Sequence, residues 1–115
     1  MTALPDLQKS VCRKFGANFL ACDESLRVGI SRDFDPLRIP INGLRHPPEG
    51  NMTGWYIWST ETFSEANDFF NVLCASHLHE VCPEILKYLG LAPGWRFLIA
   101  PGYEDVWFDE NLLNV

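Results

Sequence analysis

The stretch that decides the fold lies near the C-terminus and reads WRFLIA-PG-YEDVWFDE, from Trp95 to Glu110. Residues 95–100 are aromatic and aliphatic, which predicts a strong strand. Pro101-Gly102 then predicts a turn. Because this connection is so short, residues 103–110 are expected to return antiparallel as the second arm of a hairpin.

Two further elements are predicted at some distance from this hairpin. The run Gly54–Ser59 is dense in aromatic and β-branched side chains and is expected to form a central strand. In residues 4–15, apolar side chains recur at helical spacing, and Gly16 can end the run in a left-handed conformation. The N-terminal segment is therefore predicted to be a helix.

Helical signals also precede the hairpin. Thr62 and Glu65 form a capping-box signature that predicts a helix from about Ser64, with Phe70 and Leu73 on its apolar face. Residues 78–89 continue the helical pattern, but a proline inside a helix costs about 3 kcal/mol or more. We therefore expect two short helices there, the second beginning at Pro83.

The segment between residues 23 and 53 is rich in proline, glycine and charge, and most of it is expected to be loop. A short strand is predicted before it at Phe19–Ala21. Within the Pro-rich part, 33–50, the run Leu37–Ile41 alternates at period two. Since Pro40 cannot donate to an interior ladder, that run is predicted to be an edge strand.

These elements predict a single α+β domain over residues 1–115, with a small, mostly antiparallel sheet and helices packed on one side. The chain of 115 residues is 47% hydrophobic, enough for one core. Its formal charge of −6 disfavours nucleic acid and anionic membrane and favours a basic protein partner. With no apolar run long enough to span a bilayer and no signal-peptide pattern, we expect a cytoplasmic protein without membrane contact.

Motifs for catalysis are missing from the sequence. There is no nucleophile elbow and no glycine-rich phosphate loop, so neither an enzyme nor a bound cofactor is expected. The four cysteines lack a CxxC pair and are expected to be reduced, buried thiols. The alternative is a small metal-binding protein or enzyme that uses a cluster of Cys and His side chains, Cys74, His77, His79 and Cys82. Helical spacing would point His79 away from Cys74, which argues against this site.

The last predicted strand carries the candidate binding residues. Alternation places one set of side chains outward, and this set combines aromatic anchors with carboxylates: Tyr103, Asp105, Trp107 and Asp109. On the opposite side, Val106 and Phe108 are expected to face the core. Aromatic side chains dominate binding hot spots and carboxylates pair with Arg, so the outward set is predicted to bind a basic partner.

Several ordered blocks resemble one known family. They are Gly54–Ser59, Asp68–Phe70 with Leu78, Pro83–Phe97 and Tyr103–Glu110, and together they resemble the immunity protein 33 type. That family belongs to bacterial polymorphic toxin systems, in which a small immunity protein binds and blocks a toxin. The resemblance implies a cognate toxin as partner and supplies no catalytic residues.

Overall fold

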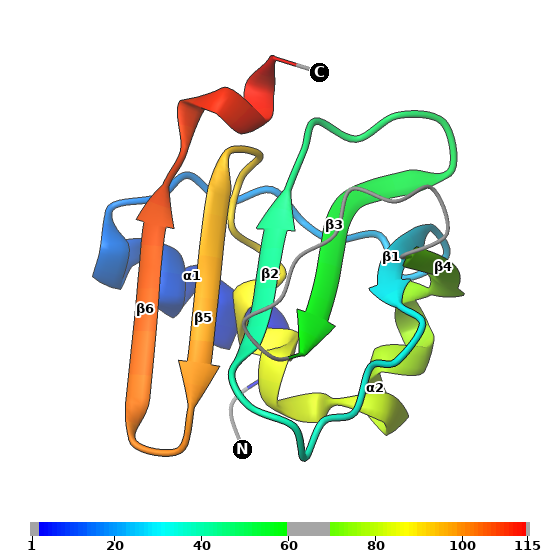
Figure 1. The fold of residues 1–115 in the computed structure, drawn as a ribbon. Helices are drawn as coiled ribbons and strands as arrows, with labels where there is room; N and C mark the ends of the chain where they lie inside the picture. The colour runs from blue at the N-terminus through cyan, green and yellow to red at the C-terminus, as the bar shows by residue number, and fades with distance from the viewer. Residues whose placement is uncertain (1–2, 60–69, 115) are drawn as a thin grey trace.

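The computed structural model describes residues 3–59 and 70–114 and contains one six-stranded sheet, with α1, α2 and η2 on one of its faces (Figure 1). The strand order is β4-β1-β3-β2-β5-β6, and every neighbouring pair is antiparallel except β1 and β3. This is the predicted α+β architecture. The strands are β1 (Arg27–Ser31), β2 (Ile41–Arg45), β3 (Met52–Ser59), β4 (Phe70–Cys74), β5 (Trp95–Ala100) and β6 (Tyr103–Phe108). The helical elements are α1 (Leu4–Phe15), η1 (Ala75–His77), α2 (Leu78–Val81), η2 (Pro83–Tyr88) and η3 (Glu110–Leu113).

The elements with the strongest local signals form as predicted. Helix α1 ends at Gly16, whose φ of 74° is the left-handed conformation expected of it. Strand β3 contains the whole of the predicted run Gly54–Ser59, and β5 pairs with β6 across the Pro101-Gly102 turn. A short 3-10 helix, η2, begins at Pro83 where the helical pattern was expected to break.

The Pro-rich half of the chain differs from its prediction. It contains two strands, β1 and β2, and β2 is an interior strand between β3 and β5. Pro40 lies immediately before β2, so it removes no donor from the ladder, and the predicted edge strand over Leu37–Ile41 is wrong. The predicted strand at Phe19–Ala21 is reduced to one isolated bridge between Phe19 and Leu91.

The helix predicted from about Ser64 is also wrong where it can be compared. Its start falls in residues 60–69, outside the described residues. Phe70–Cys74 is β4, which pairs antiparallel with β1. Pairing with a neighbouring strand therefore overrides the local helical pattern of Phe70 and Leu73.

The main core lies between the sheet and its helical layer. Trp55 and Phe97 stand on this covered face with their ring centroids 5.7 Å apart, and Tyr88 of η2 stacks on Phe97 at 4.9 Å. Helix α1 is attached to η2 by Gln8, whose side-chain amide donates to the Leu86 carbonyl at 2.9 Å. The covered face is therefore closed by packed rings and by a buried hydrogen bond between helices.

A buried arginine joins this core to two distant loops. Arg45 is 1% exposed and lies over the Trp55 ring. Its guanidinium donates to backbone carbonyls of Leu20, Ala21, Thr53, Leu89 and Leu91 at 2.7 to 3.3 Å. Burial lowers its pKa, while the carbonyl oxygens supply the acceptors that a buried cation requires.

Candidate functional site

The opposite face of the sheet has a much smaller apolar cluster. Leu44, Trp58 and Leu112 are buried there, with Tyr56 and Phe70 packed against them. Leu112 belongs to η3, which is held to this face by a 2.9 Å contact between His46 Nδ1 and the Leu112 carbonyl. Within the described residues, η3 is the helical element on this face, which we call the open face.

Strand β6 places the predicted binding residues on the open face. Val106 is 8% exposed and belongs to the core on the covered face, so alternation directs Tyr103, Asp105 and Trp107 the other way. Tyr103 is 56% exposed. Asp105 is exposed and makes no side-chain hydrogen bond or ion pair with the described part of the chain. These two side chains are available to a partner without breaking existing contacts.

The other two predicted residues are engaged within the protein. Asp109 accepts a hydrogen bond from Arg96 Nη1 at 3.2 Å and another from the Asn111 backbone N–H at 3.1 Å. The same Arg96 guanidinium lies 5.3 Å from the centroid of the Trp107 ring. Arg96 therefore offsets the charge of Asp109 and supports Trp107, which is half-buried.

One prediction about this strand is wrong. Phe108 was expected in the core, but it is 49% exposed. It lies at the end of β6, where its ring packs edge-on against Trp95 and against Gly94. The strand therefore presents an aromatic side chain near its end on each face, Tyr103 on the open face and Phe108 on the other.

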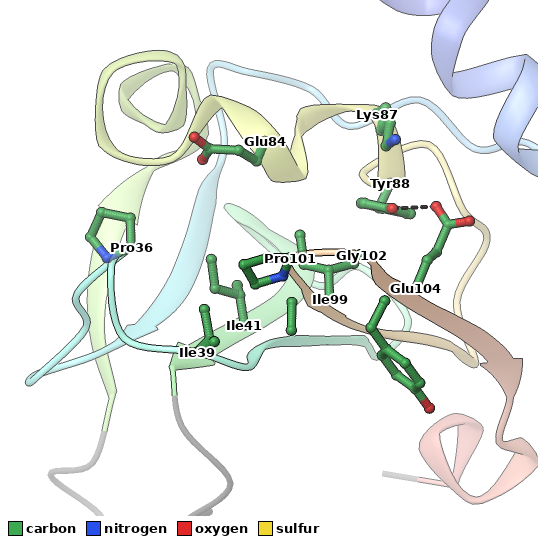
Figure 2. A pocket seen from close by; sticks show the side chains of 12 residues that line it. Pro36, Ile39, Ile41, Glu84, Lys87, Tyr88, Ile99, Pro101, Gly102 and Glu104 are labelled. Carbon is green, nitrogen blue, oxygen red and sulfur yellow. Dashed lines mark hydrogen bonds between the residues drawn. The ribbon is translucent and has the colours of Figure 1, made fainter.

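A hollow of about 600 Å³ adjoins the strand at the Tyr103 end. Figure 2 shows Ile39, Ile41 and Ile99 on one side of this hollow and Glu84 and Lys87 of η2 on another. Ile39 is 51% exposed. The hollow thus combines apolar side chains with charged ones at its margin, as binding pockets commonly do.

A network of polar side chains fixes the shape of this hollow. Tyr88 donates its hydroxyl to the Glu104 carboxylate, and Lys14 of α1 contacts the same carboxylate at 2.7 Å (Figure 2 shows the Tyr88 bond). The hydrogen bond from Lys14 is the main cause that lowers the pKa of Glu104, and the hydrogen bond from Tyr88 lowers it further. Burial is the main cause that raises the pKa of Tyr88, and the hydrogen bond to the charged Glu104 raises it further. The network joins α1, η2 and β6 around one carboxylate.

Sequence reasoning missed the hollow because its residues come from three segments that are distant in the chain. The alternation of the run Leu37–Ile41 predicts a strand and not the wall of a hollow. The sequence held a different signal there, because Leu37 and Ile39 are large apolar residues in a Pro-rich segment. In the structure they are 89% and 51% exposed. Ile39 lies with Ile41 and Ile99 in the lining of the hollow, and exposed apolar side chains that gather in this way mark binding surfaces.

The alternative metal site of Cys74, His77, His79 and Cys82 does not form among the described residues. His79 contacts Glu24, and Cys82 donates its thiol to Glu84 at 3.2 Å. Among the described residues, no group of three or more His, Cys, Asp or Glu side chains could hold a metal ion.

Two of the cysteines, Cys22 and Cys82, do not resemble nucleophiles. All four are free, and Cys12 and Cys82 are buried. Burial raises the pKa of Cys22 to about 11 and that of Cys82 to about 12, in the latter case with help from Glu84. Both thiols are therefore protonated near neutral pH, which disfavours attack by a thiolate.

Comparison with known proteins yields one match. The sequence model of the Imm33-like domain matches residues 7–109, which is most of the chain. No curated protein and no solved structure matches the chain. None of the helices in the described part of the chain is long and apolar enough to cross a membrane.

Proposed function

The chain belongs to the Imm33-like domain family, and from this membership we propose that it is an immunity protein that binds and neutralises a bacterial toxin. The family name indicates immunity proteins. The observation that supports this proposal best is the match itself, because it spans 103 of the 115 residues (7–109) and includes all six strands of the sheet, β6 among them. In this proposal the chain acts by occupying a surface of the toxin and performs no catalysis.

We further propose that contact is made through the outward side of β6. Tyr103 and Trp107 are the aromatic anchors, and both lie where a partner can cover them. Asp105 is the carboxylate that steers and pairs a basic side chain of the toxin, because it is exposed and has no partner in the described residues. Asp109 acts mainly by holding Arg96 beneath Trp107.

The net charge supports a basic toxin. Fifteen acidic residues against nine basic ones leave a formal charge of −6. A negative protein accelerates its encounter with a positive partner, and this acceleration falls as salt screens the charges. We therefore expect the association rate with the toxin to fall steeply with ionic strength.

The test begins with capture of partners by the tagged protein from its native cells and their identification by mass spectrometry. Each captured candidate is then expressed alone and together with the chain. We expect a basic domain that arrests growth alone and is harmless in the presence of the chain. If no captured protein is toxic, or if toxicity persists at equal expression, the proposal fails.

The contact surface is tested on the purified pair. Asp105→Asn should slow association by about threefold to tenfold at low salt, and the difference should shrink at high salt. The matched control is Glu80→Gln, which removes another exposed carboxylate, on α2 in the helical layer. Equal association rates for the two variants would remove β6 from the interface.

A further inference from the structure

Strand β6 is the outermost strand on its side of the sheet. Among the described residues it pairs with β5 alone, and Figure 1 shows β6 as the last strand on its side of the sheet, with α1 passing behind it. The pairing with β5 is continuous over all six residues of the strand. One complete row of backbone groups on β6 is therefore left without a ladder partner.

The geometry of the hairpin identifies that row. Asp109 N–H donates to the Gly94 carbonyl at 2.7 Å, and the two-residue turn pairs Tyr103 with Ala100. In an antiparallel ladder, hydrogen-bonded and non-bonded pairs alternate. The backbone groups of residues 103, 105 and 107 therefore point to β5, and those of Glu104, Val106 and Phe108 point outward.

This edge is protected by negative charge alone. Proteins blunt a sheet edge with charged side chains, most often Lys, or with Pro, bulges or very short strands. Residues 103–110 contain no Lys, Arg or Pro, and the register shows no bulge in the pairing of β6 with β5. The same eight residues carry four carboxylates, Glu104, Asp105, Asp109 and Glu110.

We propose that β6 receives an extended, basic segment of the toxin as an additional strand. This inference rests on the proposed function and specifies how the partner is held. The partner's backbone bonds to residues 104, 106 and 108. On the open face its Lys or Arg side chains stand beside Asp105, since neighbouring side chains on one face of adjacent strands interact.

Charge decides which occupant fits. A second copy of this chain would place two acidic β6 strands side by side, and like charges on neighbouring strands are destabilising. A strand with Lys or Arg at alternate positions has the opposite effect, because Asp105 on β6 is exposed. The acidic edge therefore disfavours self-association and favours a basic strand.

The first experiment measures backbone hydrogen exchange by NMR, free and in complex with the toxin domain that the chain neutralises. In the free protein, the amides of Asp105 and Trp107 should be protected and those of Glu104, Val106 and Phe108 should exchange rapidly. In the complex, these three amides should slow by about tenfold or more. Neutralisation without their protection would overturn this inference and leave the proposed function intact.

A second experiment needs no toxin. The probe is a synthetic nine-residue peptide of alternating Lys and Val, and the matched control replaces each Lys by Glu. We expect saturable binding of the Lys peptide, with protection of the same three amides, and none with the Glu peptide. Equal binding of both peptides, or no saturable binding of the Lys peptide at millimolar concentration, would overturn the inference.

Charge reversal sharpens the peptide experiment. Asp105→Lys should weaken binding of the Lys peptide by about tenfold. Glu80→Lys changes the net charge equally but lies in the helical layer, so it should alter binding less than about twofold. If both variants weaken binding equally, the attraction comes from net charge and not from the edge.

Discussion

The two faces of the sheet carry similar residues and use them differently. Each face has an arginine beside a tryptophan: Arg45 over Trp55 on the covered face, and Arg96 beside Trp107 on the open face. Arg45 is 1% exposed, whereas the Arg96 side chain is 28% exposed. The first pair belongs to the core and the second to a surface, so the same chemistry stabilises the fold in one place and shapes the proposed binding surface in the other.

The difference follows from what each arginine contacts. Arg45 donates to backbone carbonyls of two loops and β3, and these acceptors would be buried without a partner if it were removed. Arg96 contacts one carboxylate, which water could solvate in its place. Burial thus makes an interaction costly to lose even when the interacting groups are alike.

The largest expected effect comes from truncating these two arginines. Arg45→Met should lower the free energy of unfolding by more than about 3 kcal/mol, because several buried carbonyls lose their donor. Arg96→Met should lower it by about 1 kcal/mol or less, since its ion pair is partly exposed. Urea unfolding of both variants measures the contrast, and similar losses would contradict the distinction between the faces.

The next contrast uses two glycines that lie under aromatic rings. A Cβ at Gly43 would lie 2.2 Å from the Phe97 ring on the covered face, and one at Gly29 would lie 2.4 Å from the Tyr56 ring on the open face. Phe97 is 1% exposed and enclosed by other rings, whereas Tyr56 is half-buried and can tilt toward solvent. Gly43→Ala should therefore cost about 2 to 3 kcal/mol and Gly29→Ala about 1 kcal/mol. Thermal and urea unfolding will show whether Gly29→Ala is the milder substitution.

A smaller effect is expected where the open face meets η3. Asp109→Asn weakens the pairing with Arg96 and should destabilise the protein by about 1 kcal/mol. Asp105→Asn, four residues earlier on the same face, should change stability by less than about 0.5 kcal/mol. Equal stability of the two variants would mean that Asp109 has no structural role.

The smallest effect is a dependence of stability on pH. Lys14 and Tyr88 lower the pKa of Glu104 below its unfolded value of about 4.3. Their contribution is therefore complete above that value and is lost as the pH falls through the folded pKa. Urea midpoints of Glu104→Gln should lie below those of the native protein near pH 7 and approach them near pH 3. The difference in the free energy of unfolding between the two proteins should stay below about 1 kcal/mol, since Lys14 is largely exposed. A difference in stability that does not change with pH would exclude the charge of the Glu104 carboxylate as its cause.

Local sequence signals predicted the elements that need no distant partner. Gly16 ends α1, Pro83 separates two short helices, and Pro101-Gly102 turns the hairpin. The alternation along β6 also placed Tyr103 and Asp105 on the exposed side. These features depend on backbone conformation within a few residues, which the residue types themselves restrict.

Strand β2 could not be predicted in this way. Its sequence, Ile41–Arg45, contains an asparagine, a glycine and an arginine, which are typical of loops. Yet all five residues are buried, because the Phe97 ring occupies the space above Gly43 and distant carbonyls accept from Arg45. The partners that make this strand possible lie about fifty residues further along the chain.

By itself, the sequence determined the α+β class, the hairpin of residues 95–108 and the acidic, aromatic character of its last strand. Only the tertiary structure decided that, among the described residues, β6 is an edge and Arg96 engages Asp109 while Asp105 has no partner, and that a hollow lies beside Tyr103. Turns and strand alternation arise from steric limits on adjacent residues. Edges, ion pairs and hollows arise from contacts between residues far apart in sequence, which exist only once the sheet is assembled.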